Sequence, residues 1–310
     1  MEQSSLISHQ VSAEAIDACI QKLSLRIRKQ GDKPYASVGY QLELLQQLSQ
    51  FDFGRFLLRN QGINGYWTDY MLMHPLRGRI TGHNAQGERL TPLEHFILDS
   101  APLMLATQQR CQIFLLENQK KVEEHAVLAC VPCGMMGELL YLNYERINNI
   151  QLHGIDYDAD TLDDATSLAE NRKHTSWVTL HQADAWALDA EGAYDLISSN
   201  GLTIYEPDDL KVTLLFELFY QALKSGGKLV TSFLTPPPTQ TEPCEWDLSK
   251  IDKDHLLLQK ILFVDIIDAK FQCYRTSLQT KKQLEDVGFN RIEFIYDRAK
   301  IFPTVVAYKN

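Results

Sequence analysis

Apolar residues change their spacing near residue 126. Before that point they recur every three or four positions, as in Ile16, Ile20, Leu23 and Ile27, which is the spacing of one helix face. After it, short apolar runs alternate with stretches of helical periodicity. The pattern therefore predicts a mainly helical first part and an α/β second part.

The second part contains seven expected strands, with helical stretches between most of them. Alternation of this kind predicts right-handed βαβ units and a mostly parallel sheet. The last two strands are joined by too few residues for a crossover helix, so we expect them to be antiparallel. The expected strands cover residues 126–131, 150–155, 178–181, 194–198, 227–233, 291–296 and 305–308, and the expected helices 134–146, 159–173, 208–223 and 280–287.

Two regions lie outside this alternation. We expect residues 1–122 to form a helical N-terminal cap, in which residues 91–94 are a favourable helix start, with a capping threonine, a proline and a glutamate. The α/β domain then covers residues 123–310 and contains an insertion at 239–275 that has helical periodicity. The cap and the insertion are both expected to cover a substrate.

Charge and composition narrow the classes of function. The chain has 310 residues and a formal net charge of −10, and so lacks the basic field that nucleic-acid binding needs. No apolar run approaches the ~20 residues that span a bilayer, and no signal peptide is evident. Six irregularly spaced cysteines form no disulfide framework, which favours a reducing, cytoplasmic location. Export by a dedicated machine and a homodimer stay open.

The first expected strand runs into a turn that contains Gly134, and a helix is expected to follow. Such a turn allows a ligand close to the backbone, and the helix N-terminus favours negative charge. Asp156 follows 22 positions after Gly134, at the end of the next strand, where a carboxylate can accept hydrogen bonds from ribose hydroxyls. Taken alone, this combination fits any binder of a nucleoside or a dinucleotide.

Six segments share an order and spacing that point to one family. They are residues 131–134, 154–158, 182–186, 194–201, 223–230 and 284–289. In this order they resemble the class I S-adenosylmethionine (SAM)-dependent methyltransferases. The resemblance implies a Rossmann-like seven-stranded, mostly parallel sheet with an antiparallel last strand, SAM as the cofactor, and methyl transfer as the reaction.

The resemblance also implies where the cofactor lies. Asp156 would hold the ribose, and Asp184 would face the adenine amino group. No metal is expected. The cofactor-binding residues so predicted are Pro132, Cys133, Gly134, Asp156, Tyr157, Asp184, Ala185, Asn200 and Gly201, and Tyr205 and His74 are the candidate catalytic residues on the acceptor side.

The sequence departs from the family pattern at the first turn. The usual acid is replaced by Cys130, and two of the three glycines by Pro132 and Met136. Proline fixes φ and removes a backbone donor, so the turn geometry must differ in detail. Glu138 is a candidate replacement for the missing acid. This departure keeps a non-catalytic SAM-fold module as a second hypothesis.

The acceptor and the chemistry each allow more than one hypothesis. A small, partly apolar metabolite or a lipid-like molecule, methylated on O or N, is the first acceptor hypothesis, and a protein acceptor is the second.

Cys130 and Cys133 also match a redox or zinc motif, but no second cysteine or histidine pair accompanies them. The aromatic-rich segment before His74 either lines the acceptor pocket or packs the core of the cap. The helix expected at residues 280–287, followed by two strands, disfavours a nicotinamide oxidoreductase.

Overall fold

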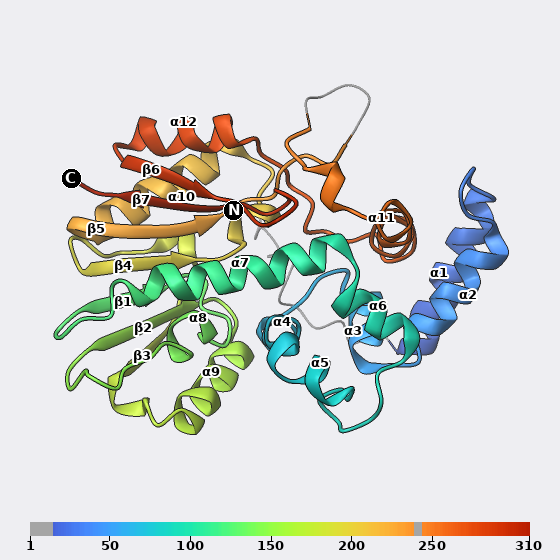
Figure 1. Cartoon of the computed structure of the whole chain (residues 1–310), viewed down its shortest axis with the longest axis horizontal. Coiled ribbons are helices and arrows are strands. Elements are labelled where there is room, and N and C mark those ends of the chain that lie inside the picture. The colour runs from blue at the N-terminus through green and yellow to red at the C-terminus, as the bar shows by residue number, and fades with distance from the viewer. Residues whose placement is uncertain (1–14, 239–243) are drawn as a thin grey trace. The chain divides into compact units, whose positions relative to one another are not determined.

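The computed structural model describes residues 15–238 and 244–310 (Figure 1). Residues 1–14 and 239–243, parts of the expected cap and insertion, lie outside the described residues. The chain divides into two compact units, of which the first comprises the residues up to Leu105 and Leu248–Phe271, and the second Ala106–Asp247 and Gln272–Asn310. The division differs from the expected one because the boundary falls within a helix and residues 248–271 join the first unit.

The first unit is helical. An ion pair and a hydrogen bond attach residues 248–271 to the earlier part of the unit. Lys33 Nζ lies 2.5 Å from Asp265 Oδ1, and the amide of Leu103 donates to Gln259 Oε1 at 2.6 Å. Its helices are α1 (Ile16–Gln30), α2 (Val38–Leu48), α3 (Asp52–Asn60), α4 (Gly65–Met73), η1 (His74–Leu76), α5 (Gly78–Thr81), α6 (Pro92–Asp99), the start of α7 (Pro102–Gln119), η5 (Leu248–Lys250), α11 (Lys253–Lys260) and the π-helical η6 (Ile261–Ile266).

Aromatic side chains form part of the core of the first unit. Trp67 is buried, and its ring centroid lies 5.2 Å from that of Phe53 and 5.3 Å from that of Tyr70. Offset and edge-to-face contacts at these distances add to the gain from burial. Trp67 thus packs in the core of this unit. This agrees with the interpretation that the aromatic-rich segment before His74 packs the core of the cap.

The expected helix start at Thr91 is confirmed. Its hydroxyl accepts a hydrogen bond from the amide of Glu94 at 3.2 Å, and Pro92 occupies the first turn of α6. We expect Thr91→Ala to lower the free energy of unfolding by about 1 kcal/mol, because one helix-terminal amide loses its acceptor. Urea denaturation measures this, and Thr91→Ser should keep the cap. Equal losses in both variants would contradict the capping role.

The second unit contains the sheet, whose order is β3-β2-β1-β4-β5-β7-β6. All neighbouring pairs from β3 to β5 are parallel, whereas β7 is antiparallel to both β5 and β6. The predicted fold class is therefore confirmed. The strands are β1 (Val127–Cys130), β2 (Gln151–Asp156), β3 (Val178–Gln182), β4 (Tyr194–Ser199), β5 (Leu223–Ser232), β6 (Asn290–Ile295) and β7 (Thr304–Tyr308).

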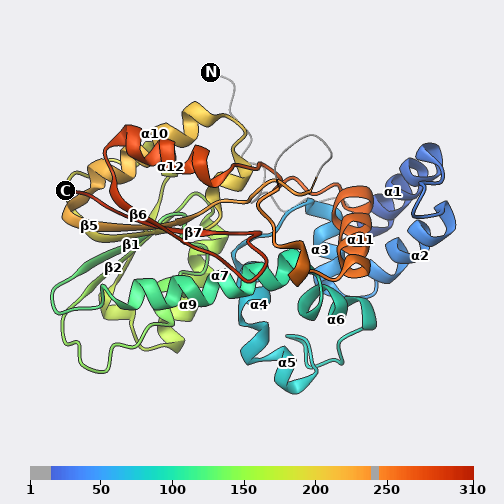
Figure 2. The ribbon, with the colours of Figure 1, turned by 45° about the horizontal axis from the view of Figure 1, so that its top comes forward.

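Helices cover both faces of this sheet (Figure 2). On one face, α10 (Asp209–Ala222) and α12 (Ser277–Val287) bury Phe216, Phe219 and Leu284. On the other, α8 (Gly137–Leu140), α9 (Ala159–Asn171) and the second half of α7 bury Leu139, Leu162 and Phe114. A sheet buried on both faces explains why its strands are continuous apolar runs.

One expected helix is largely wrong. The sequence pattern predicts one helix over residues 134–146, but α8 contains only four residues, Gly137–Leu140. Met136 has a φ of +60°, so regular helix cannot begin before it, and side chains of α7 hold the segment after it. The amide of Asn143 donates to Gln119 Oε1 at 2.8 Å, which replaces the helical hydrogen bond expected there.

Candidate functional site

The turn after β1 bends towards the end of β2. The amide of Cys133 donates to the carbonyl of Ile155 at 2.9 Å, and Gly134 has a φ of +50°. The peptide bond before Pro132 is cis, and Cys133 is buried. A Cβ on Gly154 would lie 2.6 Å from Leu180 Cδ2 and 3.1 Å from Cys133 Sγ. A side chain at position 154 would therefore displace the end of Leu180 and crowd the Cys133 thiol of the turn.

Asp156 joins this turn to the end of β2. Its Oδ2 accepts the amide of Gly134 at 2.9 Å, and its Oδ1 accepts the amide of Asp158 at 3.1 Å. Only 2% of the residue is exposed. Each carboxylate oxygen has two lone pairs, so one acceptor position on each remains for a ligand hydroxyl. The arrangement is compatible with the predicted ribose contact and adds a structural role that the sequence did not indicate.

The predicted adenine-side residues follow β2 and β3. Tyr157 is 55% exposed, whereas Ala185 is buried. The Oδ1 atom of Asp184 accepts the amide of Trp186 at 3.0 Å and so caps the 3₁₀ turn η3 (Ala185–Ala187). Asp184 therefore has a local structural role, and its carboxylate keeps further acceptor positions for a ligand.

A side chain at the end of β5 bonds to the residues that follow β4. Ser232 Oγ accepts the amide of Gly201 at 3.0 Å and lies 3.3 Å from Asn200 Oδ1. Tyr205 closes the 3₁₀ turn η4 (Leu202–Tyr205). Burial raises the pKa of Tyr205, and the charge of Arg110 offsets part of this rise. Its phenol is therefore protonated near neutral pH and can donate a hydrogen bond.

Glu138 places a carboxylate where β1 and β4 end. It accepts a short hydrogen bond from Ser198 Oγ, and Cys130 Sγ lies 3.6 Å from its Oε2. Burial raises its pKa, and hydrogen bonds from Ser198 and Asn200 oppose the rise. In the alignment that the resemblance predicts, Cys130 takes the position of the family's usual acid. The structure thus brings Glu138 next to that position, as the candidate replacement requires.

Several buried polar atoms near these strand ends have no hydrogen-bond partner within the described part of the chain. They are Arg110 Nε and Nη1, Asn118 Oδ1 and Ser199 Oγ. Unpaired buried polar atoms are costly, so this edge of the sheet has the character of a site for a polar ligand. Sequence reasoning missed Arg110. The available signal was its position as the sole charged residue between 102 and 116.

His74 belongs to the first unit and is fully buried there. Its Nε2 lies 2.9 Å from Asp99 Oδ2, and Asp99 also accepts from Arg79 Nε at 2.5 Å. The ring Nδ1 has no partner among the residues that the structure covers, and a Cβ on Gly78 would lie 2.5 Å from it. His74 therefore has one nitrogen held by a carboxylate and the other enclosed against Gly78.

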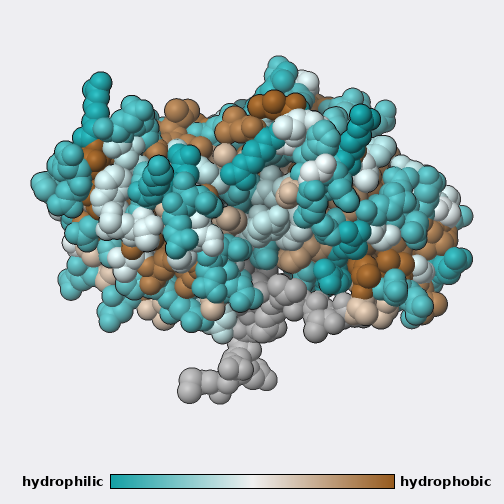
Figure 3. Space-filling view, turned by 90° about the horizontal axis from the view of Figure 1, so that it is seen from below, coloured by the Kyte–Doolittle hydropathy of each residue, from teal (hydrophilic) through white to brown (hydrophobic). Residues whose placement is uncertain are grey.

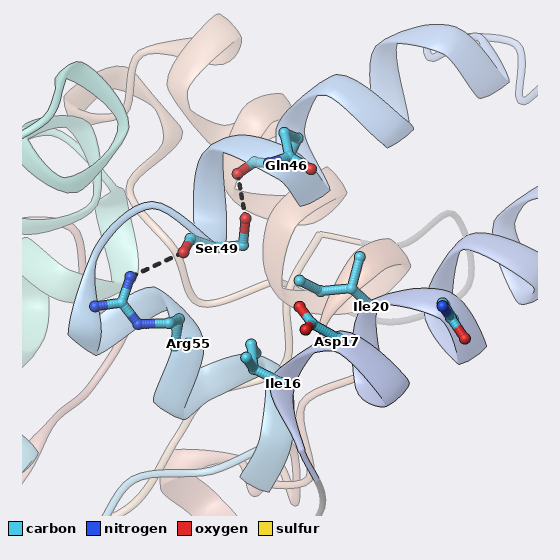
Figure 4. Close-up of a pocket in the computed structure, with 7 residues that line it drawn as sticks. Ile16, Asp17, Ile20, Gln46, Ser49 and Arg55 are labelled. Carbon is cyan, nitrogen blue, oxygen red and sulfur yellow. Dashed lines mark hydrogen bonds between the residues drawn. The ribbon is translucent and has the colours of Figure 1, made fainter.

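One pocket of about 430 Å³ lies within the first unit (Figure 4). Arg55 Nη1 donates to the carbonyl of Ser49 at 2.9 Å on its wall, and the other lining residues come from α1 and α2. None of the predicted site residues lines this pocket. Within residues 15–238 and 244–310, no cluster of three metal-ligating side chains occurs. All six cysteines are free.

Comparison with known proteins places this geometry among methyltransferases. Residues 130–227 match the family model described as a methyltransferase domain. A crystal structure of a possible exported protein from Bordetella parapertussis is 43% identical over 95% of both chains, with a TM-score of 0.87. Magnesium protoporphyrin IX methyltransferase from Synechocystis, solved with bound SAH, is 15% identical over 79% of this chain and 99% of its own, with a TM-score of 0.50. No curated protein matches the chain.

The surface and the helices bear on membrane association. The face in Figure 3 is mainly hydrophilic, with apolar residues in small separate patches. In the part of the chain that the structure describes, no helix is both long and apolar enough to cross a bilayer.

Proposed function

We propose, from the premise that this chain belongs to the class I SAM-dependent methyltransferases, that it methylates an O or N atom of a small, partly apolar metabolite or a lipid-like molecule. Members of this family are enzymes that transfer a methyl group from SAM, and this chain has their fold and matches their domain model over residues 130–227. The acceptor and the roles of individual residues are our proposal.

The observation that carries the proposal is the group of unpaired buried atoms where β1 and β4 end. Arg110, Asn118 and Ser199 each present a buried polar atom that lacks a partner among the described residues. In open α/β sheets, ligands bind outside the carboxyl ends of the strands at the switch in strand order, here between β1 and β4. These residues therefore fit a polar ligand such as SAM at that edge.

In methyl transfer, the main contribution of the protein is to position the acceptor and the cofactor. When bound, SAM supplies an electrophilic methyl group, and the acceptor lone pair must lie in line with it, near ~3 Å, in a water-poor site. We assign the sugar to Asp156 and the adenine side to Tyr157, Asp184 and Ala185. Contacts along the rest of the cofactor are assigned to Pro132, Cys133, Gly134, Asn200 and Gly201.

Tyr205 and His74 are the two candidates on the acceptor side. The enclosure of His74 by Asp99 and Gly78 favours Tyr205 as the residue that meets the acceptor. Tyr205 lies in η4, which follows Gly201 at the end of β4, and its phenol stays protonated. We therefore propose that Tyr205 orients the acceptor through a hydrogen bond.

We expect Tyr205→Phe to slow methyl transfer about fivefold, because one orienting hydrogen bond contributes roughly 1 kcal/mol. SAH affinity, measured by calorimetry, should stay within about a factor of three. Tyr220→Phe is the matched control, since the Tyr220 ring packs on Phe289 within the helical layer. Equal rates for Tyr205→Phe and the wild type would remove Tyr205 from the acceptor site.

The acceptor class is tested with radiolabelled SAM and fractionated cell extract. We expect label in the small-molecule or lipid fraction, because helical extensions are common in the small-molecule methyltransferases of this family. Label in protein would support the second hypothesis. Label in nucleic acid would contradict the argument from the net charge of −10.

A non-catalytic module is the second candidate function. The replacement of the usual acid by Cys130 and the altered glycine turn favour it. Calorimetry separates the two functions, because SAM binding without turnover on any extract fraction would support the module.

We also propose a cytoplasmic location, which the six free cysteines support, although the similar Bordetella protein is described as a possible exported protein. Cell fractionation tests this location. Size-exclusion chromatography with light scattering decides between a monomer and a homodimer.

A further inference from the structure

Arg110 is a buried cation with incomplete hydrogen bonding. The residue is 4% exposed, and its Nε and Nη1 donate to no acceptor in the described part of the chain. Its guanidinium carbon lies 3.6 Å from the ring centroid of Phe302, and a Cβ on Gly201 would lie 3.5 Å from Nη1. The guanidinium is therefore fixed against the residues that follow β4, with two donors unused.

A cation in this state is costly without an anionic partner. Burial lowers the pKa of Arg110 to about 10, and the carboxylate of Glu138 is the main charge that opposes this shift. Arginine offers a planar fork of donors, which matches the two oxygens of a carboxylate. The unused donors of Arg110 thus point to a ligand that carries a carboxylate.

Glu138 supplies the opposite charge in the same cluster. A carboxylate has about four acceptor positions. Ser198, Cys130 and Asn200 account for three of them. The remaining position suits one donor of an ammonium group. Burial raises the pKa of Glu138, but the hydrogen bonds from Ser198 and Asn200 and the charge of Arg110 favour its ionised form. In that form the two residues present a buried positive and a buried negative charge, which complement an amino acid in its zwitterionic form.

We infer that Arg110 binds the carboxylate of the amino-acid end of SAM and that Glu138 binds its ammonium group. The inference rests on the proposed SAM site and assigns the end of the cofactor for which the sequence lacked an acid. Arg110 lies outside residues 130–227, so the match to the methyltransferase domain does not include it. In this chain, the helix that precedes β1 would therefore contribute to the cofactor site.

Ligand analogues test this inference without requiring turnover. Calorimetry would compare SAM with decarboxylated SAM, which lacks only the carboxylate, and SAH with 5′-methylthioadenosine, which lacks the whole amino-acid end. We expect the wild-type protein to bind decarboxylated SAM about 10–100-fold more weakly than SAM, because it loses hydrogen bonds to a charged group. In Arg110→Met, this difference should fall to within about a factor of three.

Further variants isolate each contact. Glu138→Gln should weaken SAH about tenfold and leave 5′-methylthioadenosine unchanged, while the surface variant Arg146→Met should behave as wild type. The wild-type comparison of SAM with decarboxylated SAM stands even where Arg110→Met does not fold. Equal affinities of the wild-type protein for SAM and decarboxylated SAM would overturn the inference. An unchanged preference for SAM in a folded Arg110→Met would overturn it as well. Normal cofactor selectivity without transfer to any acceptor would instead contradict the proposed function alone.

Discussion

Glu117→Leu should lower the free energy of unfolding by about 3–5 kcal/mol, because it leaves the buried Lys228 without its counter-charge. Lys228 is 1% exposed, and its Nζ donates to Glu117 Oε2 at 2.7 Å and to the Glu117 carbonyl at 2.8 Å. Burial alone would raise the pKa of Glu117, but hydrogen bonds from Lys120 and Lys228 lower it overall. Glu117 is therefore ionised near neutral pH. Thermal and urea denaturation measure the loss.

Lys120 provides the matched control for this pair. It donates to the other oxygen of the same carboxylate at 2.6 Å, but its side chain is 64% exposed. Lys120→Met should cost only about 0–1 kcal/mol, since exposed ion pairs contribute little. The double variant Glu117→Leu/Lys228→Met should recover much of the stability, because no buried charge remains. A loss in the double variant as large as in Glu117→Leu would refute the explanation by an unpaired charge.

Asp156→Ala should weaken SAM binding by about 1–3 kcal/mol, which corresponds to roughly 5–150-fold in affinity. Two effects contribute: the proposed ribose contact is lost, and the amides of Gly134 and Asp158 lose their acceptor. Calorimetric titration with SAM and with adenosine should show the same loss, because both ligands contain the ribose.

The neighbouring acid Asp158 provides the control for Asp156. Its side chain caps α9 through the amide of Asp160 at 3.2 Å and the hydroxyl of Thr161 at 2.7 Å. Asp158→Ser can still cap the helix, so SAM affinity should stay within about a factor of three. A larger loss in Asp158→Ser than in Asp156→Ala would reverse the two roles.

Periodicity predicts the sheet well, because parallel strands buried on both faces are short apolar runs that differ clearly from amphipathic helices. It predicts the segment after Gly134 poorly. Residues 134–146 contain good helix formers, but Met136 adopts a left-handed conformation and Gln119 captures the amide of Asn143. Tertiary hydrogen bonds of this kind leave no periodic signal in the sequence.

The strand ends where the candidate residues Asp156 and Asn200 lie are predictable from the sequence, whereas their contacts with a cofactor stay a prediction. Arg110 could not be assigned in this way, because its importance depends on burial against Phe302 and Gly201, far from it in sequence. The boundary of the first unit is missed for a similar reason. Asp265 pairs with Lys33 across more than two hundred residues, and local patterns carry no information about such a partner.

The position of β7 bears on how this protein can be made in the cell. The strand is the last element in the sequence, yet it lies between β5 and β6, and among the described strands β6 pairs with no other. β5 ends at Ser232 and β7 begins only at Thr304, so until β7 has been synthesised the emerging sheet has an open edge at β5. Nascent chains that stall before Thr304 should therefore depend on chaperones or be degraded.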